Sequence, residues 1–77
     1  MPSKMKPRQV CKDFIRLYLT GQEVDAPEVA NRMVDLWGIR VDWHETGYAL
    51  EDLAQVGEVT RMGTGYDGMA RYFVEVD

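Results

Sequence analysis

Apolar residues recur at helical spacing in three segments of this 77-residue chain. The first segment, residues 7–20, repeats them at intervals of three and four, which is the period of one helix face. Pro7 suits the first position of a helix and Gly21 suits its end. The residues expected on the buried face of this helix are Val10, Cys11, Phe14, Leu17 and Tyr18.

Two further helices are bounded by capping signals. Asp25 and Glu28 form a capping-box pattern before a helix over 26–37, which Gly38 closes. Asp42 and Glu45 repeat that pattern before a helix over 43–56. Both tryptophans are expected to anchor the core, because each buries a large apolar area. The expected buried residues are Val29, Ala30, Met33, Leu36 and Trp37 in the second helix, and Trp43, Thr46, Leu50, Leu53 and Ala54 in the third.

After Gly57 the period changes from helical to alternating. Residues 58–62 and 70–76 predict two strands, joined by a glycine-rich loop over 63–68. An isolated hairpin is marginally stable, so one of its faces should pack on the helices. The expected fold class is α+β, a three-helix bundle followed by a C-terminal two-stranded hairpin. We expect one domain over 1–77, with residues 1–5 frayed.

Composition narrows the class of protein. The length leaves no room for a large catalytic fold, and 45% hydrophobic residues exclude a disordered chain. The lone Cys11 forms no internal disulfide, and no apolar stretch is long enough for a membrane span, so we expect a cytoplasmic protein. The net charge of −4 conceals a segregation: residues 1–20 carry five bases and one acid, and residues 21–60 carry two bases and nine acids.

No motif indicates catalysis or a cofactor. Gly63, Gly65 and Gly68 match a dinucleotide-binding fingerprint, but a strand rather than a helix is predicted after them. His44 is the only histidine, and Cys11 lies on an apolar helix face, so neither belongs to a metal-ligand pattern. We therefore expect no catalytic residue, no metal and no cofactor, and a protein that is not an enzyme.

The order of three helices and a hairpin resembles the winged helix-turn-helix superfamily over residues 7–76. The resemblance is clearest at residues 49–62, ALEDLAQVGEVTRM, and at residues 27–33, PEVANRM. It implies that residues 43–56 are the recognition helix, which enters the major groove of DNA, and that residues 63–68 are the tip of the wing.

The leading hypothesis is a DNA-binding module of the transcription-regulator type, which binds duplex DNA through its basic N-terminal segment and its wing. Tyr66 is either a contact at the wing tip or a side chain folded back over the hairpin. The candidate DNA contacts are Lys4, Lys6, Arg8, Arg40, His44, Tyr48, Arg61, Tyr66 and Arg71.

The charge of the third helix favours an alternative. No lysine or arginine occurs between Arg40 and Arg61, and the acids in that stretch would repel phosphate. The alternative is a protein-interaction or homodimerisation module that does not bind DNA and that uses the acidic face of the third helix. The candidate partner contacts are Glu45, Glu51, Asp52 and Gln55.

Overall fold

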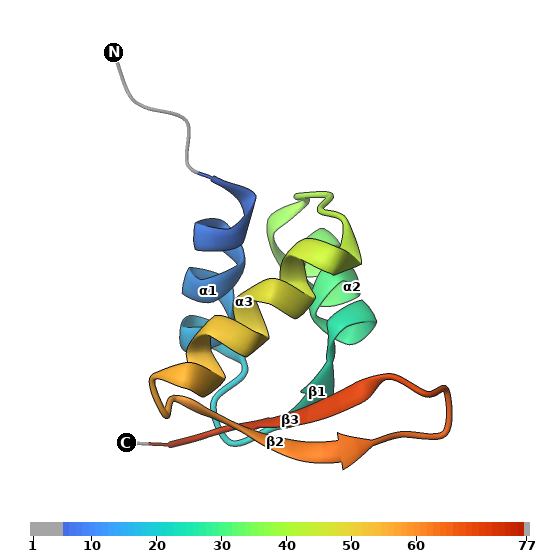
Figure 1. Cartoon of the computed structure of the whole chain (residues 1–77). Coiled ribbons are helices and arrows are strands. Elements are labelled where there is room, and N and C mark those ends of the chain that lie inside the picture. Colours follow the sequence, from blue (N-terminus) through green and yellow to red (C-terminus); the bar gives the residue numbers. More distant parts are fainter. Residues whose placement is uncertain (1–5, 77) are drawn as a thin grey trace.

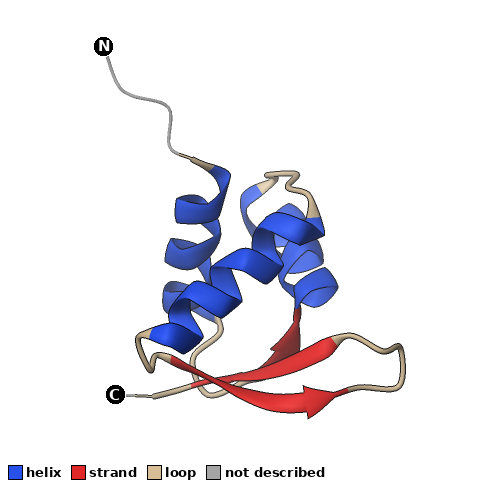
Figure 2. Cartoon of the chain, viewed as in Figure 1, coloured by secondary structure: helices blue, strands red, loops and turns tan. Residues whose placement is uncertain are grey.

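Three helices stand on one side of a three-stranded antiparallel sheet in the computed structural model, which describes residues 6–76 (Figure 1). The expectation for residues 1–5 lies outside this described part. The helices are α1 (Pro7–Tyr18), α2 (Ala26–Trp37) and α3 (Trp43–Gln55), and the strands are β1 (Glu23–Asp25), β2 (Val59–Thr64) and β3 (Ala70–Val74). The α+β class is confirmed, and Figure 2 shows the helical layer above the strands.

The sheet has a third strand that the alternating pattern did not predict. β3 lies in the centre, with the predicted hairpin partner β2 on one edge and β1 on the other. β1 is only three residues long and pairs Val24 with Tyr72 and Asp25 with Arg71. A segment of three residues is too short to show an alternating pattern in the sequence, so only its pairing with β3 in the structure identifies β1 as a strand. The expected hairpin is confirmed as β2 and β3, and β1 adds a third strand to it.

The boundaries of α2 follow the capping signals closely. α1 instead ends at Tyr18, before Gly21, which was expected to close it, and Lys6 at its start makes no side-chain cap. Asp25 accepts a hydrogen bond from the Glu28 amide at 2.9 Å, and the Glu28 carboxylate accepts one from the Asp25 amide at 3.0 Å, which confirms the first capping box. Gly38 ends α2 at a φ of 66°, in the left-handed region that favours glycine. The second predicted box does not form, because the Asp42 carboxylate accepts the His44 amide at 2.9 Å and not that of Glu45.

The core lies where the three helices meet the inner face of the sheet. Phe14, Met33, Leu50 and Leu53 are fully or almost fully buried there. Several predicted core positions are wrong. In α1, the buried face contains Cys11, Phe14 and Ile15 rather than the residues after Ile15. The wrongly assigned side chains, each exposed by two fifths or more, are Leu17, Tyr18, Leu36 and Trp43.

The exposed apolar side chains of the helices have different surroundings. Tyr18 and Trp37 pack together beside Phe14, and the Trp37 indole N–H donates to the Tyr18 hydroxyl at 3.1 Å.

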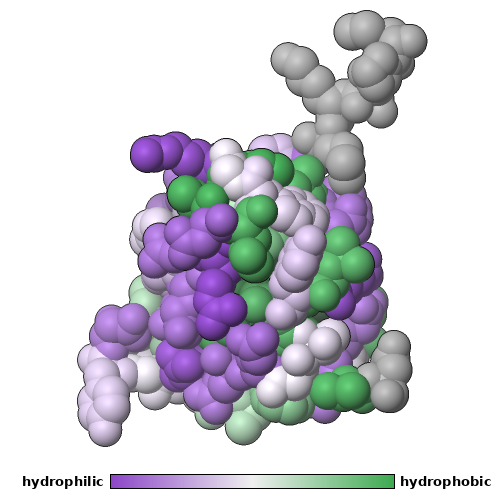
Figure 3. Space-filling view, turned by 180° about the vertical axis from the view of Figure 1, so that it is seen from behind, coloured by the Kyte–Doolittle hydropathy of each residue, from purple (hydrophilic) through white to green (hydrophobic). Residues whose placement is uncertain are grey.

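Seen from behind, the face opposite α3 shows hydrophobic side chains among hydrophilic ones (Figure 3). Within residues 6–76, no helix has the length and apolar character that crossing a membrane requires.

Candidate nucleic-acid interface

One side of α3 is left uncovered because the other side forms the core. Thr46, Ala49, Leu50 and Leu53 are buried, so the intervening residues project outward. We define the α3 face as the outward residues His44, Tyr48, Glu51, Asp52 and Gln55; His44, Tyr48 and Gln55 are exposed, and the two acids are half-buried. α3 crosses in front of α1 and α2 in Figure 1.

Basic side chains of α1 border the α3 face on one side. The Lys12 Nζ atom lies 3.1 Å from an Asp52 carboxylate oxygen, and the Arg8 guanidinium lies 3.7 Å from the same oxygen. Arg8 also lies 4.8 Å from the centre of the Tyr48 ring, within cation–π range. Lys6 lines the same surface hollow as Arg8, Lys12 and Asp52. Lys6, just before α1, and Arg8 and Lys12 in its N-terminal half thus place three basic side chains along one border of α3.

Arg61, in β2, borders the other side of the α3 face. Its guanidinium lies 3.5 Å from a Glu51 carboxylate oxygen, which also accepts a hydrogen bond from the Tyr72 hydroxyl. Burial, together with this hydrogen bond to Glu51, raises the pKa of Tyr72 to about 12. Two adjacent carboxylates of α3, Glu51 and Asp52, therefore each hold bases from a different border.

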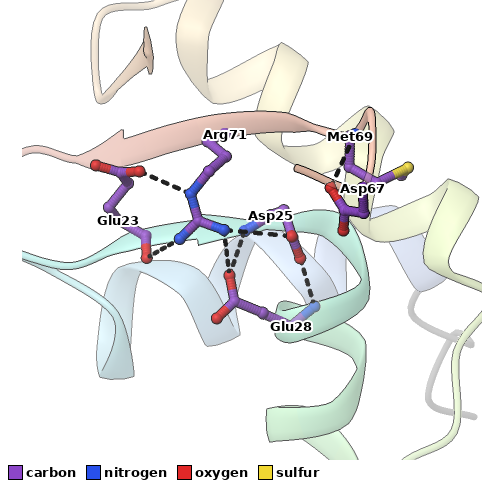
Figure 4. Close-up of polar contacts among 6 residues, drawn as sticks. All are labelled: Glu23, Asp25, Glu28, Asp67, Met69 and Arg71. Carbon is purple, nitrogen blue, oxygen red and sulfur yellow. Dashed lines mark hydrogen bonds and ion pairs between the residues drawn. The ribbon is translucent and has the colours of Figure 1, made fainter. Parts of the chain in front are cut away.

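Arg71 occupies a different environment, on the β1 side of the sheet (Figure 4). Its guanidinium lies 2.7 Å from the Glu23 carboxylate, 3.2 Å from that of Glu28 and 3.4 Å from that of Asp25. The hydrogen bond to Glu23, with the neighbouring carboxylates, raises the pKa of Arg71 above its ordinary value. Arg71 thus ties β1 and the start of α2 to β3, and the structure does not bring it to the α3 face.

The remaining candidate residues are dispersed. Arg40 lines a shallow groove with Asn31 and Asp35 of α2. Tyr66 is fully exposed at the tip of the wing, so it is not folded back over the hairpin. Lys4 lies outside the described residues, and Glu45 faces the hollow beside α1.

His44 is held by its own helix start. Its Nδ1 atom lies 2.8 Å from the Asp42 carboxylate, and its ring stacks on Trp43 with centroids 4.0 Å apart. The backbone hydrogen bond from His44, followed by the side-chain one, lowers the pKa of Asp42. His44 is therefore oriented at the first turn of α3, where it is exposed to solvent.

Two residues of this surface were not predicted for it. Lys12 has no place among the candidate contacts, although its spacing of four from Arg8 puts both on one side of α1. Trp43 was expected in the core, yet it lines an apolar groove of about 210 Å³ between α3 and β3. Its position after a helix cap, with the apolar Leu50 seven residues on, gave no signal of exposure.

The described part of the chain contains no cluster of potential metal ligands. Over residues 6–76, no three His, Cys, Asp or Glu side chains come together in a way that could hold an ion. Cys11 is buried, and its burial raises the pKa of the thiol to about 11. A neutral thiol in the core packs as a small apolar side chain rather than reacting as a nucleophile.

The comparisons with known proteins agree with this geometry at the level of the fold. No protein-family model and no curated protein matches the chain. Its structure is similar to the crystal structure of the Vibrio cholerae ferric uptake regulator (Fur), with a TM-score of 0.66 and 19% sequence identity. The match covers 97% of this chain and 55% of that chain, and the report of that structure describes a rearrangement of its DNA-binding domains. A winged-helix-like fold is thereby supported.

Proposed function

We propose that this chain is a winged-helix module that binds duplex DNA through the α3 face and serves transcription regulation. His44 and Tyr48, in the first half of α3, would face the nucleobases. Lys6, Arg8 and Lys12 on one border, and Arg61 on the other, would contact the phosphates.

One observation carries this proposal: basic side chains from two distant segments of the chain border the same uncovered helix face. Arg8 and Lys12 reach Asp52 from α1, and Arg61 reaches the adjacent Glu51 from β2. Phosphate contacts orient a protein on the duplex, whereas contacts to base edges select the sequence. A helix face bordered by bases on both sides meets the first of these requirements. The similarity to a protein with DNA-binding domains supports the same reading.

The acids of α3 limit the affinity without preventing binding. Exposed ion pairs are worth about 0.2–1 kcal/mol each, so Arg8 and Arg61, whose side chains are exposed, can exchange a carboxylate for a phosphate at small cost. The exchange leaves Glu51 and Asp52 near the duplex, which lowers the affinity. We therefore expect weak binding that depends strongly on salt.

The test is the fluorescence anisotropy of a labelled duplex of about 20 base pairs, titrated with the full chain between about 50 and 200 mM salt. Binding should be detectable at low salt and should weaken steeply as salt rises, because each neutralised phosphate contributes about 0.9 to the logarithmic slope. Millimolar or weaker binding at low salt would contradict the proposal.

A matched pair of double variants tests the location of the interface. Arg8→Gln/Arg61→Gln removes two bases that border the α3 face, and Arg32→Gln/Arg40→Gln removes two arginines of α2 and the loop after it. Both variants change the net charge equally. The first should lose about two contacts from the salt slope, and the second should bind nearly as the parent does. Equal losses would place the duplex elsewhere or show that only net charge matters.

A further inference from the structure

The groove between the first turns of α3 and the start of β3 has features that contact with DNA does not explain. It has a volume of about 210 Å³ and is lined mainly by apolar surface. We call it the aromatic groove and define it by Trp43, Gly47, Tyr48, Glu51, Met69 and Tyr72. His44 also lines this groove, and Arg8 reaches its Tyr48 wall and Arg61 its Glu51 wall.

The walls of the aromatic groove are large side chains left partly in water. Trp43 is 44% exposed and Tyr48 is 51% exposed, although both are apolar enough to be buried. The faces of tryptophan and tyrosine rings attract cations through the ring quadrupole. Arg8 already occupies such a position over Tyr48, at 4.8 Å from the ring centre. These walls suit a ligand with a flat cationic group.

The floor of the aromatic groove is a glycine in the middle of a helix. An added Cβ at Gly47 would lie 3.6 Å from the Ala26 Cβ, which is ordinary van der Waals contact, and the backbone there is not left-handed. Alanine would therefore fit and would stabilise α3, because glycine is a poor residue for a helix interior. The glycine keeps the groove deep at a cost to the helix.

The polar wall of the aromatic groove is negatively charged. The Glu51 side chain is 40% exposed, and its only ion pair within the described residues is the 3.5 Å contact with Arg61. Aromatic walls together with a carboxylate are complementary to a cation.

We propose that the aromatic groove binds an arginine side chain from a segment of a partner protein. The volume is below the roughly 300–1,000 Å³ of a small-molecule pocket, so it suits one long side chain. Arginine fits better than lysine, because its planar guanidinium stacks on aromatic rings and donates two hydrogen bonds to a carboxylate. The inference does not depend on the proposed DNA binding. A partner seated here would compete with DNA for Tyr48 and Glu51.

The test uses ¹⁵N-labelled full chain and the peptide acetyl-Gly-Arg-Gly-amide, followed by NMR. A single side chain should bind with a dissociation constant of about 1–10 mM. The Trp43 indole N–H signal should shift saturably, whereas that of Trp37, which donates to Tyr18, should not. The matched peptide with citrulline, which has the shape of arginine without its charge, should shift the signal much less. No shift at about 20 mM, or equal shifts from both peptides, would overturn the proposal.

Two variants separate binding in the aromatic groove from general effects. Gly47→Ala should weaken the peptide about tenfold while raising the melting temperature, so a loss cannot be attributed to unfolding. Glu51→Gln should also weaken the peptide, whereas Glu45→Gln, on the same helix but outside the groove, should not. Unchanged affinity in Gly47→Ala would refute the site.

A short duplex added in place of the peptide distinguishes the two proposals. If duplex DNA moves the Trp43 signal and the arginine peptide does not, the aromatic groove belongs to the DNA interface and the protein partner is excluded. If the peptide binds and the duplex does not, the proposed DNA binding fails while the groove proposal stands.

Discussion

Arg61 and Arg71 stand on neighbouring strands of the same hairpin and differ in almost every physical respect. The Arg61 side chain is 62% exposed and has one ion pair, at 3.5 Å. The Arg71 side chain is 30% exposed and reaches three carboxylates and the Glu23 carbonyl (Figure 4). The first is available to a ligand, and the second joins elements of the fold.

The difference comes from the third strand. β1 places Glu23 and Asp25 beside β3, and the capping box of α2 adds Glu28. Arg71 therefore meets an acidic pocket built by residues more than forty positions away in sequence. Arg61, on the edge strand β2, meets one carboxylate of α3, Glu51, and the ring of Tyr72 in β3. The cationic character of an arginine decides little until its neighbours are known.

The largest effect should come from the buried partner of Arg71. Asp25 is 5% exposed, caps α2 and lies 3.4 Å from Arg71, so Asp25→Ala removes a helix cap and an ion-pair partner together. We expect a loss of about 2 kcal/mol in the free energy of unfolding, measured by urea denaturation. The control is Asp35→Ala, an exposed acid of α2, which should stay within about 0.5 kcal/mol. A loss of that small size for Asp25→Ala would show that the Arg71 site does not stabilise the fold.

The second effect is a separation of two measurements between the two arginines. Arg71→Gln should lower the urea midpoint clearly and leave duplex affinity nearly unchanged, because Arg71 forms its ion pairs with carboxylates of β1 and α2. Arg61→Gln should leave stability within about 0.5 kcal/mol and lower duplex affinity. If both variants behave alike in the two assays, the distinction between the arginines is wrong.

A third, smaller effect should follow when the carboxylates that hold the bases are neutralised. Glu51→Gln/Asp52→Asn frees Arg8, Lys12 and Arg61 and should raise duplex affinity about fivefold, corresponding to about 1 kcal/mol of ion pairing. The matched variant Asp35→Asn/Glu45→Gln changes the net charge equally but frees none of these bases. It should raise affinity less, in the same anisotropy assay, and an equal gain in both would mean that only net charge matters.

A further effect concerns pH and the shared carboxylate Glu51. The folded pKa of Tyr72, about 12, lies above the ordinary value of 10.0, so the folded chain keeps a proton that the unfolded chain releases. Stability that is present below pH 10 should therefore be lost as the pH rises toward 12. Urea denaturation across this range should show a steeper decline for the parent than for Tyr72→Phe. Identical slopes would indicate that the phenol titrates normally.

Much of the fold could be predicted because its signals are local. The capping box of Asp25 and Glu28, the left-handed Gly38 and the change of period after Gly57 each depend on residues close in sequence. The inward faces of the helices were harder to predict. Apolar residues at 14, 15, 17 and 18 allow several faces, and packing against α3 selected the one with Phe14 and Ile15.

The candidate site could be predicted only in part. Lys6, Arg8 and Arg61 were found from charge, and they do border α3. That Arg71 lies away from the α3 face, and that Lys12 and Trp43 lie beside it, depends on distances in the folded chain. The spacing of residues along the sequence does not give those distances. Charge patterns give the kind of ligand but not which charges are already paired.

By itself, the sequence of this chain determined three helices, a hairpin, and a contrast between a basic start and an acidic middle. These follow from backbone hydrogen bonding, hydrophobic period and the count of ionisable groups, all of which act over a few residues. Only the tertiary structure decided that β1 joins the sheet, that Arg71 is enclosed while Arg61 is open, and that Trp43 borders a groove. Burial and ion pairing depend on which distant segments meet, and that is a property of the packed chain.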